Sequence, residues 1–209
     1  MKILVNLIGL SHHDVGNGLH SFEKCYQSLF DKVVIPLEKK GHEVDFFLKT
    51  YETEKQNEIE SIYEPVKSDF IQMGNRGVQG AFDTYLKSIN ELKGMDYDYY
   101  IVTRFDLWFG EQINLDFNKF SFLFKELDWW DNYKCTTDTF YGFPKLMLDR
   151  FVKACNDCRN KNGQPGYIGL FHALHLDLEN YINPNQFNFI DEEKQTVQIS
   201  KKYKLSRYL

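Results

Sequence analysis

The chain lacks any long apolar run. Its N-terminal hydrophobic stretch, residues 1–10, is interrupted by Lys2 and Asn6 and ends at the polar Ser11. A membrane-spanning helix needs about 20 apolar residues, and a secretory signal needs a basic segment followed by a longer apolar one. We therefore expect no membrane span and no signal peptide. We expect a soluble cytoplasmic protein, which could also be part of a longer multidomain chain.

Cysteine is scarce, and its spacing is irregular. The four cysteines stand at positions 25, 135, 155 and 158, and only Cys155 and Cys158 form a close pair. A zinc site needs two more ligands at comparable spacing, and a thioredoxin-like motif opens a helix after an early strand. Neither pattern is present, so the sequence indicates buried or helix-surface thiols in a reducing compartment.

Clustered positive charge is also scarce. The chain has 25 Lys and Arg against 30 Asp and Glu, a net charge of −5, and the basic residues are mostly interspersed with acidic ones. A protein that coats a nucleic-acid duplex needs clustered Lys and Arg, so no nucleic-acid partner is expected. The exception is the basic C-terminal segment, residues 201–207. We interpret it as a solvated tail, and a binding patch is the alternative.

Aromatic residues are abundant, with 18 Phe and 13 Tyr in 209 residues that are 43% hydrophobic. This length and composition are typical of one globular domain, residues 1–209. A buried strand is predicted at residues 3–8, an amphipathic helix at 20–40 and an alternating strand at 42–48. A strand, a helix and a second strand form a βαβ unit, which predicts an α/β fold.

The longest β-rich run covers residues 97–109 and predicts a central strand with both faces covered. In open α/β sheets, ligands bind beyond the carboxyl ends of the strands. Arg104 and Asp106 stand near that end, two residues apart. An arginine there can bind a diphosphate, and an aspartate can bind a divalent metal. The alternative is a structural ion pair between the two.

Four segments together resemble the glycosyltransferases of the GT-A fold, especially the small sugar transferases of large DNA viruses and some bacterial capsule loci. They are the first strand at Met1–Leu10, Asn75–Arg76 at a helix opening, the run Asp98–Leu107, and the turn Thr137–Pro144. The family's usual metal motif is Asp-x-Asp at the end of the central strand. In this chain it reads Arg104-Phe105-Asp106, so an arginine replaces the first acid.

The resemblance implies a three-layer, Rossmann-like sheet, mostly parallel or mixed, flanked by helices. It also implies a nucleoside-diphosphate sugar as donor, with uridine as the expected nucleoside, and Mn²⁺ or Mg²⁺ as cofactor. The loop after the first strand, which contains Gly9, Leu10 and Ser11, would hold the base and ribose. For a viral enzyme the location would be the host cytoplasm.

Four further residues enter the predicted site. Arg76 lies near a helix start, where anions are favoured, and could contact the phosphates; a surface arginine is the alternative. Asp138 occupies a position that faces the donor sugar or the acceptor in the resembling enzymes, which suggests a general base. His172 and His175 share a helical face and could complete the ligand set of a metal at Asp106, or be ordinary helix residues.

The sequence thus predicts a metal-dependent glycosyltransferase that moves a hexose from a nucleoside-diphosphate sugar to a glycan acceptor. Asp106 and Asp138 would be its catalytic carboxylates. Because one carboxylate stands where the family has two, a non-catalytic nucleotide- or glycan-binding domain is the alternative. A nucleotidyltransferase or sugar-phosphate enzyme on a similar sheet is a third.

Overall fold

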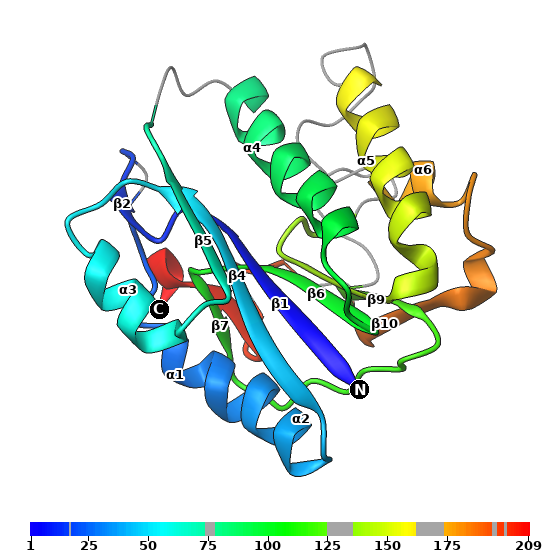
Figure 1. Cartoon of the computed structure of the whole chain (residues 1–209), viewed down its shortest axis with the longest axis horizontal. Helices are drawn as coiled ribbons and strands as arrows, with labels where there is room; N and C mark the ends of the chain where they lie inside the picture. The colour runs from blue at the N-terminus through cyan, green and yellow to red at the C-terminus, as the bar shows by residue number, and fades with distance from the viewer. Residues whose placement is uncertain (17, 74–77, 125–135, 162–173, 194–195, 199) are drawn as a thin grey trace.

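A seven-stranded sheet runs through the middle of the computed structural model (Figure 1). The structure describes residues 1–209 except 17, 74–77, 125–135, 162–173, 194–195 and 199. The strands of the sheet are β1 (Lys2–Gly9), β4 (Glu43–Tyr51), β5 (Lys67–Ile71), β6 (Tyr99–Arg104), β8 (Phe120–Phe124), β9 (Phe140–Pro144) and β10 (Phe187–Asp191). Their order is β10-β8-β9-β6-β1-β4-β5.

Most neighbouring strands in this sheet are parallel. β5, β4, β1 and β6 form a parallel block, β9 runs antiparallel to both β6 and β8, and β10 is parallel to β8. Parallel strands need crossover connections, usually helices, that cover the faces of the sheet. The mixed, mostly parallel α/β sheet expected from the sequence is confirmed.

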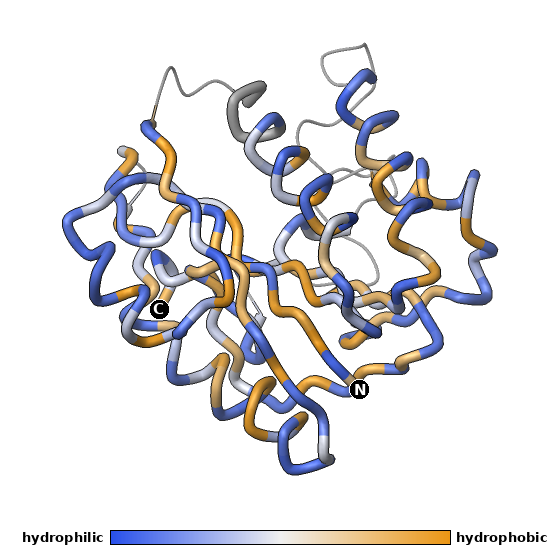
Figure 2. Tube along the Cα trace, in the orientation of Figure 1, coloured by the Kyte–Doolittle hydropathy of each residue, from blue (hydrophilic) through white to orange (hydrophobic). Residues whose placement is uncertain are grey.

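Helices cover both faces and give three layers (Figure 1). One face carries α1 (Tyr26–Leu29), the π-helix η1 (Phe30–Val34), α2 (Ile35–Lys39) and α3 (Gln56–Tyr63). The other carries α4 (Val78–Glu91), the 3-10 turns η2 (Leu92–Gly94) and η3 (Lys145–Met147), α5 (Leu148–Lys161) and α6 (Leu174–Leu178). Figure 2 shows hydrophobic and hydrophilic residues alternating along the helices, as in amphipathic helices with one buried side.

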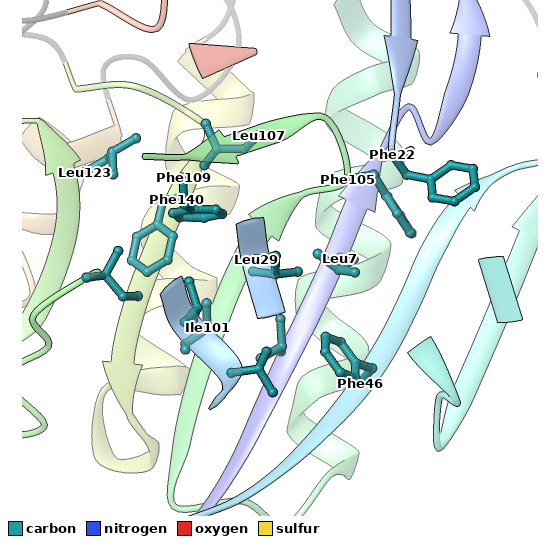
Figure 3. Close-up of a cluster of buried hydrophobic side chains, with 14 of the residues drawn as sticks. Leu7, Phe22, Leu29, Phe46, Ile101, Phe105, Leu107, Phe109, Leu123 and Phe140 are labelled. Carbon is teal, nitrogen blue, oxygen red and sulfur yellow. The ribbon is translucent and has the colours of Figure 1, made fainter. Parts of the chain in front are cut away.

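Two hydrophobic cores follow from the alternation of side chains along β1. Val5 and Leu7 point into the core beneath α1–α3, and Leu4 and Ile8 into the core beneath α4 and α5. Figure 3 shows the first of these, where Leu7, Leu29, Phe46 and Phe105 lie together. Among the described residues, no helix is long and apolar enough to cross a membrane.

The amphipathic helix predicted at residues 20–40 is wrong at its start. A short hairpin of β2 (His12–Asp14) and β3 (Leu19–Ser21) comes first, and helical structure begins only at Tyr26. Gly16 and Gly18 in the connecting turn have φ values of +84° and +108°, which favour glycine. The hairpin places His20 in a strand, where its side chain is buried.

The continuous strand predicted at residues 97–109 is interrupted by a turn. β6 ends at Arg104, the chain turns at Phe105 and Asp106, and β7 (Leu107–Phe109) then leaves the main sheet. It pairs antiparallel with β11 (Tyr203–Leu205), whose chain continues into the 3-10 turn η6 (Ser206–Tyr208). The C-terminal segment is therefore packed against the protein, and its interpretation as a solvated tail is wrong. A further 3-10 turn, η5 (Pro184–Gln186), precedes β10.

Candidate functional site

The strand order of the sheet reverses between β1 and β6. The chain passes from β1 outward to β4 and β5, then crosses back to add β6 on the other side of β1. At such a reversal the crossovers leave in opposite directions and open a crevice beyond the carboxyl ends of the strands, where ligands bind in this fold class. Ile8 pairs with Arg104 in the register of these two strands. Gly9 and Arg104 therefore stand side by side where the fold predicts a ligand.

The loop after β1 turns sharply at Gly9, whose φ is +92° and whose missing Cβ would meet no atom within 4 Å. Thr50 Oγ1 anchors this loop by donating a hydrogen bond of 2.7 Å to the Gly9 carbonyl, and it lies 2.9 Å from Ser11 Oγ. Ser11 is fully buried and Leu10 partly so. The Ser11 hydroxyl therefore holds the loop in place, while Gly9 and Leu10 are partly exposed.

Arg104 and Asp106 form a two-pronged ion pair across the turn after β6. Arg104 Nε donates to Asp106 Oδ1 at 2.8 Å, and Arg104 Nη2 donates to Asp106 Oδ2 at 3.0 Å. Asp106 is completely buried, whereas 16% of the Arg104 side chain is exposed. The third guanidinium nitrogen of Arg104, Nη1, makes no hydrogen bond to the described residues. The arginine is thus held rigidly by one edge while Nη1 keeps its donors for another partner.

His20 adds a second partner to the same carboxylate. Its Nδ1 lies 2.5 Å from Asp106 Oδ2, and its Nε2 lies 3.0 Å from Nη1 of Arg207. Because a guanidinium can only donate, Nε2 must accept this hydrogen bond, and the proton of the ring sits on Nδ1. His20 is therefore a neutral imidazole that links Asp106 to Arg207.

Arg207 reaches this place because the C-terminal segment is pinned to the Asp106 turn. The Ser206 amide donates to the Asp106 carbonyl at 2.8 Å, and the Ser206 hydroxyl accepts from the Ser21 amide at 2.9 Å. The first contact directly follows the pairing of β11 with β7, and the second joins the turn after β11 to β3; Figure 1 shows β7 beside the red C-terminal segment. Residues 104, 106, 20 and 207 thus come from three parts of the chain that are far apart in sequence.

The charges of this cluster reinforce one another. Burial alone would raise the pKa of Asp106, but the Arg104 guanidinium and the His20 hydrogen bond hold that pKa well below its ordinary value. Burial alone would lower the pKa of Arg104, but Asp106 and, more weakly, Asp138 raise it. Asp106 is therefore a permanent anion, and Arg104 a permanent cation, at neutral pH.

Asp138 borders the same cluster from the segment before β9. It is only 7% exposed, and its carboxylate makes no hydrogen bond to the described residues. Its carbonyl accepts a 2.9 Å hydrogen bond from the Tyr85 hydroxyl on α4, and burial raises the pKa of that phenol, which stays protonated. The neighbouring Thr139 carbonyl accepts from Thr103 Oγ1 on β6 at 2.9 Å. The backbone at Asp138 is thus fixed beside Arg104, while its carboxylate keeps its lone pairs for another partner.

A divalent metal held by Asp106 does not fit these contacts. Three donors occupy the two Asp106 oxygens, the carboxylate is buried, and a positive guanidinium stands 2.8 Å from Oδ1, where it would repel a cation. In the part of the chain that the structure describes, no group of three or more His, Cys, Asp or Glu side chains could hold a metal. Mn²⁺ or Mg²⁺ at Asp106 would first have to displace Arg104 and His20.

Two residues of the predicted site, Arg76 and His172, lie outside the described residues, so the predicted metal set of Asp106, His172 and His175 is not tested as a whole. His175 is buried on α6, which packs against α5. Its neighbour Asp177 pairs with Lys161. The helical face expected to carry a distal ligand is thus part of the packing between two helices.

Gly9, Arg104, Asp106 and Asp138, four of the predicted site residues, lie near the ends of β1 and β6, and His20 and Arg207 join the Arg104–Asp106 pair there. The sequence analysis did not place His20 or Arg207 in this site. The signal for His20 was weak, because the polar loop at residues 9–18 has the glycines of a hairpin turn but no strong strand pattern. For Arg207 the only signal was the basic composition of residues 201–207, for which a binding patch was the alternative; its position depends on pairing between strands about a hundred residues apart.

A scan against protein-family models and a search of curated proteins found no match to this chain. Its function therefore has to be inferred from the geometry of the site.

Proposed function

We propose that this protein is a glycosyltransferase that moves a hexose from a nucleoside-diphosphate sugar, with uridine as the expected nucleoside, to a hydroxyl of a glycan acceptor. One observation carries the proposal. At the reversal of strand order between β1 and β6, the chain gathers two guanidinium groups and a carboxylate that makes no hydrogen bond to the described residues. A leaving group with two phosphates needs positive partners such as the guanidinium groups, and an attacking hydroxyl needs a base such as the carboxylate.

Arg104 binds the diphosphate in this proposal. Its Nε and Nη2 are committed to Asp106, so the Nη1 edge is held in one orientation and directed away from the pair. An arginine that is already fixed loses little side-chain entropy when it binds, and guanidinium groups match the geometry of phosphate oxygens. The Gly9 turn at the end of β1 lets the backbone approach the nucleoside closely.

Asp138 is the proposed general base. The acceptor oxygen attacks the anomeric carbon of the donor sugar, its proton passes to the Asp138 carboxylate, and the bond between the sugar and the phosphate oxygen breaks. The electron pair of that bond leaves with the nucleoside diphosphate, whose new charge is stabilised by Arg104. Such a displacement inverts the configuration of the anomeric carbon.

The test separates binding from transfer. Asp138→Asn keeps the volume of the side chain but cannot accept the proton, so transfer from a panel of UDP-hexoses to glycan acceptors should fall by about 10²–10⁴-fold. Binding of UDP, measured by calorimetry, should stay unchanged. The matched control is Asp149→Asn on the exposed start of α5, which should leave both unchanged.

Two outcomes would contradict the proposal. Equal transfer by the wild type and Asp138→Asn removes this residue as the base. Binding of nucleoside diphosphates without hydrolysis or transfer of any donor sugar would favour the alternative, a nucleotide-binding domain without catalysis.

A further inference from the structure

The Asp106 carboxylate is a structural anchor for cations. It orients Arg104 directly through two hydrogen bonds and Arg207 indirectly through the neutral imidazole of His20. Removing this carboxylate from its three donors to ligate a metal would leave two guanidinium groups without their common support. The contacts therefore favour a site in which the arginines, and no metal, provide the positive charge.

We propose that the diphosphate of the donor is bound without a divalent cation, by Arg104 and Arg207 acting as a pair whose geometry is set by Asp106 and His20. This inference rests on the proposed function, because it names what binds the phosphates in that same site. It assigns a binding role to Arg207, and it gives Asp106 and His20 positioning roles.

Arg207 is a cation without an acidic partner among the described residues. Its one hydrogen bond is to His20 Nε2, a neutral acceptor, and its Nε is buried without any hydrogen bond. Its guanidinium carbon also lies 4.8 Å from the centre of the Tyr208 ring, a contact that favours a cation but does not neutralise it. A partly buried guanidinium that lacks a counter-ion is stabilised by an anionic ligand, which supplies the missing acceptors.

The two arginines are close enough to act on one ligand. Arg104 Nη2 lies 3.5 Å from Nδ1 of His20, and Arg207 Nη1 lies 3.0 Å from Nε2 of the same ring. The two guanidinium groups thus lie against the two nitrogens of the same imidazole ring, and in the proposal one diphosphate contacts both of them. Asp106 balances one of the two positive charges, and the Asp138 carboxylate borders Arg104. The two guanidinium groups would therefore bind the phosphates through directed hydrogen bonds, not through an excess of positive charge.

The backbone keeps Arg207 in this position. Ser206 is bonded to the Asp106 turn and to the β2–β3 hairpin, and Gly18 of that hairpin approaches so closely that an added Cβ would lie 3.2 Å from Arg207 Cβ. An alanine at position 18 would require both an unfavourable φ and a shift of Arg207. The C-terminal segment is therefore built into the site.

The experiment measures UDP and GDP binding by calorimetry, first to the full chain treated with EDTA and then with added Mn²⁺. We expect one of these nucleotides to bind with the same affinity in both conditions. Arg207→Gln should weaken its binding by about 10- to 100-fold, as expected for the loss of a charge-assisted hydrogen bond. Binding of the corresponding nucleoside, which has no phosphates, should not change.

Two further variants keep the result interpretable. Arg150→Gln makes the same chemical change at an exposed position of α5 and should bind the nucleotide like the wild type. Arg207→Lys keeps the charge but loses the planar fork, so it should fall between the wild type and Arg207→Gln. If Arg207→Gln does not fold, the comparison of Arg207→Lys with the wild type provides the test.

The outcomes distinguish this inference from the proposed function. Nucleotide binding that EDTA abolishes and Mn²⁺ restores would overturn metal-independent binding and leave the glycosyltransferase proposal standing. Unchanged nucleotide affinity in folded Arg207→Gln or Arg207→Lys would overturn the role of Arg207. If neither nucleotide binds with or without Mn²⁺, the proposed function fails as well.

Discussion

Replacing Asp106 by asparagine tests the buried ion pair directly. Asparagine has nearly the same volume as aspartate, so the change removes the charge without opening a cavity. It leaves the Arg104 guanidinium without its counter-ion and places an amide beside Nδ1 of His20. We expect a folded but clearly destabilised protein.

The size of this destabilisation follows from burial. Asp106 is fully buried and 84% of the Arg104 side chain is covered, so solvent screens the pair weakly. Removing one partner of a buried ion pair costs about 3–5 kcal/mol, because the remaining charge stays desolvated. For a domain of 150–250 residues each kcal/mol lowers Tm by roughly 2–4 °C, so Asp106→Asn should lower Tm by roughly 6–20 °C.

The pH dependence gives the same pair a second signature. The folded pKa of Asp106 is depressed, so the stability that it contributes is present above the ordinary carboxyl pKa of about 3.9 and is lost as the pH falls through the folded value. The difference in unfolding free energy between wild type and Asp106→Asn should therefore be constant near neutral pH. It should shrink as the pH falls below about 4.

Thermal melts at pH 7 and urea denaturation at several pH values measure this difference between wild type and Asp106→Asn. Asp149→Asn, at an exposed position, is the control. A stabilising buried pair is refuted if Asp106→Asn melts within about 2 °C of the wild type at pH 7, or if the difference between the two proteins grows as the pH falls.

Three other predictions concern the frame of the fold. Ser88 accepts a hydrogen bond of 2.9 Å from the buried Asn6 side chain and donates one of 3.1 Å back to it. Ser88→Ala should therefore lower the unfolding free energy by about 1–3 kcal/mol in urea titrations, and an unchanged midpoint would contradict this. Gly142→Ala should lower the unfolding free energy by about 1–3 kcal/mol in the same assay, because the added Cβ would lie 2.8 Å from the hydroxyl of the buried Tyr99. A fully stable variant would show that the Tyr99 ring can move aside. Cys25 is buried, and burial raises the pKa of its thiol, so it should resist alkylation in the native protein and react fully in urea. Rapid alkylation of Cys25 in the native protein, detected by mass spectrometry, would contradict this.

The parallel core of the fold could be predicted because its signals are local. The apolar run at residues 3–8 becomes β1 almost without change, and the alternation at 42–48 becomes the first two-thirds of β4. Both stretches are short and rich in β-prone residues, and most of β1 and the last six residues of β4 are buried. The location of the site then follows from topology, since any polar residue at the end of β6 must stand at the reversal of strand order.

The turn at Phe105 and Asp106 could not be predicted from composition. The residues on both sides of it are equally β-prone, and no Gly or Pro marks the break. The chain turns there because Leu107–Phe109 pairs with Tyr203–Leu205 instead of continuing the sheet. That partner lies near the other end of the chain, so the break depends on a tertiary contact and not on local propensity.

If the chain is a glycosyltransferase as proposed, one arrangement of charge would account for the arginine at position 104, where the resembling enzymes have the first acid of their metal motif. Two acids on this turn would repel each other and need a cation between them. With arginine at position 104, the protein supplies that cation itself, and the remaining acid at position 106 is neutralised within the fold. The pair alone would leave no net charge for an anionic ligand. In the proposed site, Arg207, delivered by the C-terminal segment and held by His20, would add a second guanidinium group for the phosphates. In this proposal the arginine at position 104 and the docked C-terminal segment are two parts of one electrostatic arrangement, and each is expected to lose its function without the other.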